Sequence, residues 1–229
     1  MPAPQTTTPV SPRRQALIVL VGITAHWRKR RHLRRYFQAR CDYDVFVPDL
    51  PYRKPLAEVA AWYAAYLQNV VRPERYDKLH CIAYIAAGTL LRCLPPGDPA
   101  FERLVCFRGP YQEMVAQRLV QRIGRFLAGL IAGKTALDLA DGWPGRQPLR
   151  RQARHEALIL EQGRSRMARW LGIRADDIPP AAWLATDLLP TAEAVLPVPQ
   201  SHDDVYTADN ILAAALEFIR QGDFPTRQT

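Results

Sequence analysis

The sequence predicts an α/β fold, with a three-layer, doubly wound and mostly parallel sheet and a helical lid segment. Short apolar runs rich in β-branched residues recur along the chain, and longer stretches with helical spacing of apolar residues follow most of them. This alternation is typical of a parallel sheet covered by helices on both faces. Ligands bind such sheets at the carboxyl ends of the strands, so the residues directly after each strand are the candidates for function.

Six apolar runs have the length and composition of buried strands. The first covers residues 16–22, Ala-Leu-Ile-Val-Leu-Val-Gly, which is apolar on both faces and therefore fits the interior of a parallel sheet. The others are expected at residues 44–48, 78–84, 103–108, 156–160 and 193–198.

Helical patterns fill the segments between these strands. A basic stretch follows the first strand, and apolar residues recur at helical spacing over residues 56–70, 86–94 and 114–131. A final helix is expected over residues 210–221, with Gly222 as its stop. The segment 112–150 contains the long amphipathic stretch and is the expected lid.

Length and composition predict one domain over residues 15–229. Residues 1–14 are rich in Pro and Thr and are expected to be a disordered leader. No apolar run approaches the roughly 20 residues of a transmembrane helix. The four cysteines show no C-x-x-C pair and no metal-ligand spacing, which is typical of reduced thiols and favours a cytoplasmic protein.

Much of the net charge of +9 comes from the basic run at residues 28–35. One interpretation is a patch for phosphates, in nucleic acid or on a lipid surface. The other is the solvated face of a helix that docks through its apolar residues, namely Trp27, Leu33, Tyr36 and Phe37. No nucleic-acid-binding motif accompanies the run, so nucleic acid is an unlikely partner.

Three segments at the ends of strands resemble the α/β-hydrolase family, in particular its bacterial lipase and esterase branch. His202 lies directly after the last expected strand and before the closing helix, where the family places its catalytic histidine. Arg108-Gly-Pro110 resembles a strand-end segment that precedes the excursion over the pocket. The resemblance implies Asp177 as the acid, with Asp176 as the alternative, and it covers nearly all of residues 16–224.

The family's nucleophile is expected in a G-x-S-x-G turn between strand and helix. The matching residues here are Ala83-Tyr84-Ile85-Ala86-Ala87, so Ile85 takes the place of the nucleophile. A hydrocarbon side chain has no lone pair with which to attack a carbonyl. Because a β-branched residue is a poor choice for positive φ, we expect the turn to be relaxed and Ile85 to face the apolar interior.

A displaced nucleophile has few candidates. The three serines are Ser11, Ser165 and Ser201, and none follows the third expected strand. Cys81 lies within that strand, and Thr89 lies one turn into the following helix. The oxyanion side has Val21-Gly22-Ile23 where the family has His-Gly, so the N–H groups of Ile23 and Ala86 remain as a donor pair.

Two functions follow from these observations. The first is a degenerate hydrolase-like protein without ester hydrolysis, whose pocket binds a small acyl or carbonyl ligand or a protein partner, with an anionic lipid surface as a possible contact of the lid. The second is an ester or thioester hydrolase that uses a non-standard nucleophile with His202 and Asp177. The scattered histidines predict no metal site, and the absence of a glycine-rich phosphate loop predicts no nucleotide cofactor.

Overall fold

A computed structural model describes residues 14–23, 25–94, 101–142, 151–183 and 189–225. The strands are β1 (Gln15–Leu20), β2 (Asp44–Phe46), β3 (Lys78–Tyr84), β4 (Phe101–Arg108), β5 (Ala153–Gly163) and β6 (Ala194–Ser201). The helices are α1 (Trp27–Gln38), α2 (Leu56–Tyr66), α3 (Ala86–Leu91), α4 (Tyr111–Ile123), α5 (Arg125–Ala132), α6 (Lys134–Ala140), α7 (Arg166–Trp170) and α9 (Asp209–Gln221). Residues 1–13 of the expected leader and residues 143–150 of the expected lid lie outside the described residues.

The described strands form one sheet in the order β2-β1-β3-β4-β5-β6, and every neighbouring pair is parallel. Helices α1 and α9 pack on one face of the sheet, and α2 and α3 pack on the other. Successive side chains of β1 point to opposite faces of the sheet. Leu17 packs with α1 and α9, whereas Ile18 packs with α2 and α3. The predicted three-layer, doubly wound fold is confirmed.

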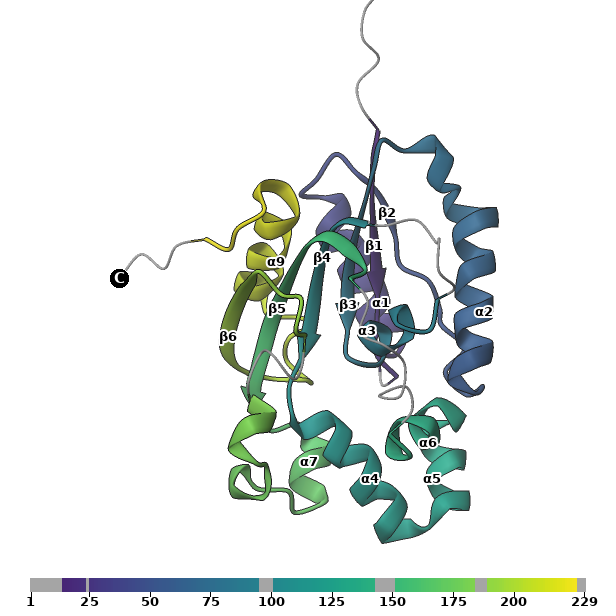
Figure 1. Ribbon diagram of the computed structural model, residues 1–229, viewed down its shortest axis with the longest axis vertical. Helices are drawn as coiled ribbons and strands as arrows, with labels where there is room; N and C mark the ends of the chain where they lie inside the picture. The colour runs from purple at the N-terminus through teal and green to yellow at the C-terminus, as the bar shows by residue number, and fades with distance from the viewer. Residues whose placement is uncertain (1–13, 24, 95–100, 143–150, 184–188, 226–229) are drawn as a thin grey trace, which may run out of the picture.

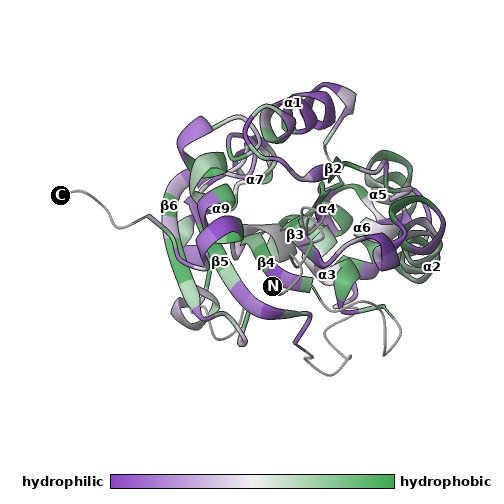
Figure 2. Cartoon of the chain, turned by 90° about the horizontal axis from the view of Figure 1, so that it is seen from above, coloured by the Kyte–Doolittle hydropathy of each residue, from purple (hydrophilic) through white to green (hydrophobic). Residues whose placement is uncertain are grey.

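Helix α1 is amphipathic, and Figure 2 shows its outer face as hydrophilic. Leu33, Tyr36 and Phe37 are buried against the sheet, as the sequence predicts. The prediction that Trp27 docks on the sheet is wrong. Trp27 is the first residue of α1, and 56% of its surface is exposed. Most of the basic run is thus the outer face of a docked helix.

The long amphipathic stretch does not form one helix. Gly124, at φ 80°, ends α4 and begins α5, and Gly133, at φ 86°, separates α5 from α6. Glycine populates positive φ without a steric penalty, so the chain turns at both positions. Helices α4, α5 and α6 therefore lie as three short helices next to the carboxyl ends of the strands, together with α7 (Figure 1). We refer to α4–α6 as the lid helices.

His80 lies in the middle of the sheet and makes stability depend on pH. Its ring is fully buried on β3, stacks on Tyr43 and bonds to the Gln15 side chain. Burial, followed by the charge of Arg103, lowers the pKa of His80 from 6.5 to about 4. Between these values the unfolded histidine binds a proton and the folded one does not, so acid favours unfolding.

We therefore expect the free energy of unfolding to contain a His80 contribution that is complete above pH 6.5 and is lost as the pH falls towards 4. Between pH 7 and pH 4.5 this loss should be about 2–3 kcal/mol. Urea denaturation of the wild type and His80→Gln across this range measures it. The variant should have the shallower pH dependence, and equal slopes in the two proteins would contradict the assignment.

Candidate functional site

The turn between β3 and α3 is tight and strained. Ile85 connects the two elements with φ 48° and ψ −100°. Its N–H donates to the carbonyl of Phe107 on β4, and its own carbonyl accepts from Thr89 on α3. These two bonds hold a single residue between the strand and the helix. The prediction of a relaxed turn is therefore wrong, because the strand-to-helix connection dictates the backbone even with a β-branched residue.

The side chain of Ile85 also differs from its predicted orientation. It is half-buried and lines a pocket between the sheet and the lid helices, and it does not join the apolar core. Positive φ costs a non-glycine residue on the order of 1–3 kcal/mol, and the surrounding structure must supply that energy. A hydrocarbon group thus occupies the strained and accessible position at the end of the third strand.

The carboxylate beside His202 belongs to Glu161. His202 follows β6, and its Nδ1 lies 3.6 Å from Oε2 of Glu161 near the end of β5. The Glu161 side chain is 2% exposed and that of His202 is 14% exposed. A carboxylate at this distance favours the tautomer with a proton on Nδ1, which leaves Nε2 as the acceptor. The carboxylate thus lies on the Nδ1 side of the ring, just beyond hydrogen-bonding distance.

Close backbone packing holds Glu161 in place. Gly109 lies next to it after β4, and a Cβ at this position would lie 2.4 Å from the carbonyl oxygen of Glu161. Only glycine permits this approach between the ends of neighbouring strands. The Gly109 of the Arg-Gly-Pro segment thus serves the packing around the acid.

Asp177 lies elsewhere. It ends a short 3-10 helix (Ala175–Asp177), is exposed, and accepts a hydrogen bond from the backbone N–H of Arg174 at 2.8 Å. Its neighbour Asp176 is also exposed. The structure does not pair either aspartate with His202. Glu161 was missed, although a carboxylate at the end of an apolar strand was a signal that could have found it.

A phenol contacts the other side of the His202 ring. The Tyr206 hydroxyl lies 3.3 Å from Nε2 of His202 and accepts a hydrogen bond from the N–H of Gly22 at 3.2 Å. With the proton of His202 on Nδ1, the hydroxyl donates to Nε2. The approach requires Gly22, because a Cβ there would lie 2.8 Å from the hydroxyl oxygen. Tyr206 therefore occupies the basic nitrogen of the imidazole.

Tyr206 is buried on all sides. Its ring is fully buried and stacks on Tyr84 with 4.4 Å between the centroids, and Tyr84 in turn stacks on Phe107. Burial, followed by the charge of Glu161, raises the pKa of Tyr206 well above its ordinary value. The ammonium of Lys29 lies 4.3 Å from the ring centroid. The hydroxyl is therefore protonated and out of reach of a ligand.

A hollow lies between the carboxyl ends of the strands and the lid helices, and we refer to it as the lid pocket. It has a volume of about 140 Å³. Its lining comes from the ends of β1, β3 and β6, from the start of α7 and from all three regions of the lid: Gly22, Ile23, Ile85, Ala86, Val115, Ala116, Leu119, Ala132, Ala136, Leu139, Ser165, Met167, His202 and Asp203. The structure thus brings Ile23, Ala86 and His202 to one apolar pocket at the carboxyl edge of the sheet.

Solved structures similar to this chain include a thioesterase domain, an α/β-hydrolase enzyme and a lipase-esterase related protein. The thioesterase domain of NocB from the nocardicin cluster aligns over 90% of this chain and 94% of its own, with 16% identity and a TM-score of 0.54. The α/β-hydrolase enzyme MGS-MChE2, from a sediment metagenome of the lagoon of Mar Chica, Morocco, aligns over 91% and 93%, with 17% identity and a TM-score of 0.53. A lipase-esterase related protein from Clostridium acetobutylicum aligns over 89% and 93%, with 12% identity and a TM-score of 0.53.

The chain has the α/β-hydrolase fold. At these identities the similarity establishes the fold alone. The sequence matches no protein-family model, and no curated protein is similar to it.

In an α/β-hydrolase fold the triad follows the chain order nucleophile, acid, histidine. Ile85, Glu161 and His202 follow that order, at the carboxyl ends of β3, β5 and β6. Asp177 follows the same order but is not beside the histidine. Ile85, whose side chain has no reactive atom, therefore lies at the same edge of the sheet as Glu161 and His202.

The other hydroxyl and thiol groups near the ends of these strands are either hydrogen-bonded or buried. Ser165 lines the pocket, and its oxygen caps α7 by accepting from Ala168 N–H. Ser201 donates to Asp204 at 2.6 Å. Cys81 is fully buried within β3, where burial raises its thiol pKa well above the ordinary value. Thr89 is buried one turn into α3.

Proposed function

We propose that this protein is a non-catalytic α/β-hydrolase-fold protein whose lid pocket binds a small acyl or carbonyl compound. The observation that carries the proposal is the apolar side chain of Ile85 at the nucleophile position. Ile85 adopts the strained strand-to-helix turn, here called the elbow, in which a nucleophile would present its reactive oxygen, but its side chain has no such atom. The buried Tyr206 hydroxyl on Nε2 of His202 supports it, because a base engaged by an internal phenol is not free to accept a proton from a ligand.

The pocket suits a short acyl group. Its volume of about 140 Å³ resembles that of an apolar cavity of about 150 Å³ that accepts benzene. The backbone N–H groups of Ile23 and Ala86 border it and have no hydrogen-bond acceptor among the described residues. In this proposal they donate to the carbonyl oxygen of the ligand, while the chain of the ligand packs on Val115, Ala116 and Leu119 of α4.

The alternative is an ester or thioester hydrolase with a different nucleophile. Tyr206 is the hydroxyl that touches His202, but its full burial prevents contact with a substrate. Ser165 reaches the pocket, but its oxygen accepts the N-cap hydrogen bond of α7. We therefore favour binding without hydrolysis.

Calorimetric titration with methyl hexanoate, together with an assay of p-nitrophenyl butyrate hydrolysis, tests the proposal. We expect saturable binding and no turnover above the uncatalysed rate. Ala116→Phe should abolish binding by filling the pocket, whereas Ala65→Phe, on the exposed side of α2, should not. Turnover that disappears in His202→Ala would contradict the proposal.

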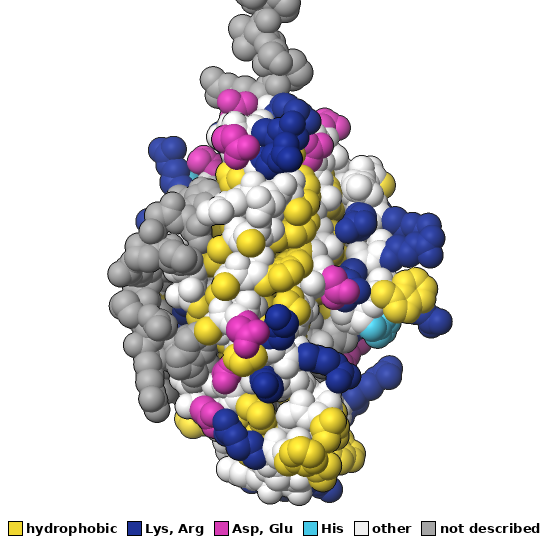
Figure 3. Space-filling view, turned by 90° about the vertical axis from the view of Figure 1, so that its right-hand side faces the viewer, with side chains coloured by type: hydrophobic (Ala, Val, Ile, Leu, Met, Phe, Trp, Pro, Cys, Tyr) yellow, Lys and Arg dark blue, Asp and Glu magenta, His cyan; other side chains and the backbone are white. Residues whose placement is uncertain are grey.

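The exposed face of α5 supports a second role, contact with an anionic lipid surface. Phe126, Leu127, Leu130 and Ile131 are 81%, 50%, 56% and 65% exposed. Figure 3 shows hydrophobic side chains gathered at the lower end of the molecule, where α5 lies, with Lys and Arg around them. An apolar helix face with a basic rim is the pattern of helices that bind at bilayer surfaces. Among the described residues no helix is long and apolar enough to span a bilayer.

We expect sedimentation with phosphatidylserine-containing vesicles, and weaker sedimentation with phosphatidylcholine alone. Phe126→Glu should weaken binding at least about tenfold, because it replaces an exposed aromatic side chain, which would insert into the bilayer, by a charge. Val70→Glu provides the control, since Val70 is 53% exposed and lies in the short helix after α2, outside the lid helices. Equal binding of the two variants would contradict a role of α5.

A cytoplasmic location is part of the proposal. Cys41, Cys81, Cys93 and Cys106 are all free thiols. Reduced cysteines in this number are typical of proteins in a reducing compartment.

A further inference from the structure

A second hollow lies beside the lid pocket. It has a volume of about 470 Å³ and lies between the end of β1, the start of α1, the loop 49–54 and the junction of α5 with α6. Gly22, Ile23 and Ala132 line both this hollow and the lid pocket. The two spaces therefore adjoin at the end of β1, directly beside the predicted donor N–H of Ile23.

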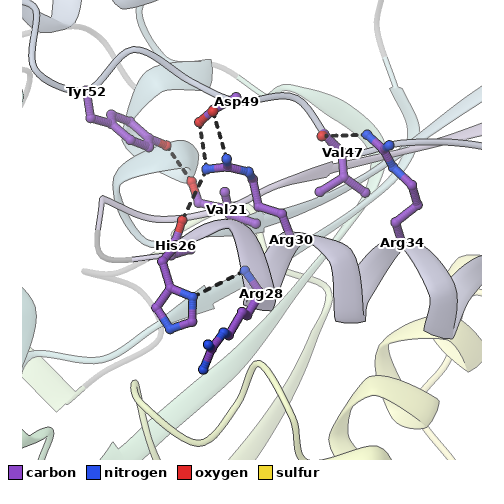
Figure 4. A network of polar contacts seen from close by, with 9 residues as sticks. Val21, His26, Arg28, Arg30, Arg34, Val47, Asp49 and Tyr52 are labelled. Atoms are coloured by element: carbon purple, nitrogen blue, oxygen red, sulfur yellow. Dashed lines mark hydrogen bonds and ion pairs between the residues drawn. The ribbon is translucent and has the colours of Figure 1, made fainter.

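The two spaces differ in charge. The lid pocket is lined mainly by aliphatic residues, whereas the second hollow is lined by Arg30, Asp49, Arg53 and Lys54. Arg30 and Asp49 neutralise each other in a bidentate ion pair (Figure 4). Nη1 of Arg30 lies 2.6 Å from Oδ1 of Asp49, and Nη2 lies 2.7 Å from Oδ2. Arg53 and Lys54 add further positive charge to the lining, and no ion pair of Arg53 is found among the described residues. Lys54 also contacts Glu58 at 3.4 Å, but both side chains are more than half exposed, so that pair is weak.

The loop that carries these cations is held on both sides. The Tyr52 hydroxyl donates to the carbonyl of Val21 at 2.6 Å, which ties the loop to β1 (Figure 4). On the other side Thr135 donates to the carbonyl of Lys54 at 2.7 Å. A Cβ at Gly133 would lie 2.4 Å from the carbonyl oxygen of Tyr52, so the lid packs directly on the loop. The backbone of the basic loop is thus fixed relative to both spaces.

We propose that one ligand occupies both spaces, with a short acyl group in the lid pocket and a phosphate-bearing head in the basic hollow. This inference rests on the proposed function and names its ligand class. A phosphate matches the hollow because Arg53 and Lys54 line it and only Lys54 has an ion pair among the described residues, a weak and exposed one with Glu58. Charge-assisted hydrogen bonds to phosphate are among the strongest that Arg and Lys make. The Arg53 guanidinium and the Lys54 ammonium bind the phosphate oxygens, and the carbonyl of the ligand lies at Ile23.

Two chemical sources present an acyl group with a phosphate head, namely acyl thioesters of a nucleotide coenzyme and acyl esters of glycerol phosphate. Titration with hexanoyl-coenzyme A and with 1-hexanoyl-glycerol 3-phosphate separates them, because only one of the two linkers should fit. Methyl hexanoate is the uncharged reference. We expect at least one phosphate ligand to bind the wild type at least about tenfold more tightly than methyl hexanoate, and this preference to fall as salt is added.

Arg53→Glu/Lys54→Glu should weaken the binding of that phosphate ligand at least about tenfold and leave methyl hexanoate unchanged. Arg35→Glu/Arg75→Glu changes the net charge equally at exposed positions outside the hollow, and should affect neither ligand. If methyl hexanoate binds but the phosphate ligands gain nothing, or if both double variants behave alike, this inference is overturned while the proposed function stands. If no ligand binds and Ala116→Phe changes nothing, the proposed function itself fails.

Discussion

The double variant Ile85→Ser/Tyr206→Phe is expected to hydrolyse p-nitrophenyl butyrate at least about 100-fold faster than the wild type. Serine at position 85 places a hydroxyl in the elbow conformation that Ile85 already adopts. Removal of the phenol frees Nε2 of His202, and Glu161 still faces Nδ1. The freed imidazole can then accept the proton of the serine hydroxyl, which activates the nucleophile.

The single variants distinguish this mechanism from a general loosening of the fold. Ile85→Ser alone should be less active than the double variant, because Tyr206 still donates to Nε2 of His202. Tyr206→Phe alone should be inactive, since Ile85 supplies no nucleophile. Addition of Glu161→Gln to the double variant should lower its activity, and addition of Asp177→Asn should not. A folded double variant without turnover, or equal losses from the two acid substitutions, would contradict the assignment.

Tyr206→Ala is expected to lower the free energy of unfolding by about 3–5 kcal/mol, as truncation of a large buried aromatic side chain does. Tyr206 is fully buried and ends a stack that continues through Tyr84 to Phe107. The substitution leaves a cavity beside β3 and an unsatisfied N–H on Gly22. Denaturant unfolding at neutral pH measures the loss.

Two comparisons test the origin of this loss. Tyr206→Phe keeps the ring stack and removes only the hydroxyl, so it should cost about 1–3 kcal/mol for the buried N–H of Gly22. Val70→Ala, at an exposed side chain, should cost within about 0.5 kcal/mol. If Tyr206→Ala were no more costly than Val70→Ala, the expected contribution of the buried Tyr206 stack to stability would be contradicted.

The pattern of strands and helices was predictable because each element carries its own signal. Each of the six predicted runs contains or overlaps one observed strand, since buried parallel strands are apolar on both faces. The main local error was the prediction of one continuous helical stretch through Gly124. The positive φ of Gly124 divides the amphipathic stretch of residues 114–131 into two helices, and Phe126, one of the apolar residues of that stretch, is exposed on α5. Apolar spacing indicates a helix but does not reveal what covers its face.

The candidate site was only partly predictable. His202 and Ile85 were found because each directly follows a strand, a position that the chain itself marks. The acid was assigned to Asp177 from the resemblance of its segment to the family, whereas the carboxylate that faces His202 is on β5. The elbow was expected to relax, but the hydrogen bonds of Ile85 to neighbouring elements impose its positive φ. In both cases a tertiary contact outweighed the local preference.

By itself the sequence determined that a parallel α/β sheet forms and that a hydrocarbon side chain follows its third strand. Both are properties of neighbouring residues, namely apolar periodicity and the chemistry of one side chain. Only the tertiary structure decided that Glu161 and Tyr206 lie on opposite sides of His202, and that the lid and a basic loop enclose adjoining spaces. These contacts join residues far apart in the chain, such as Gly22 and Tyr206 at a separation of 184 residues, and strand order and packing create them.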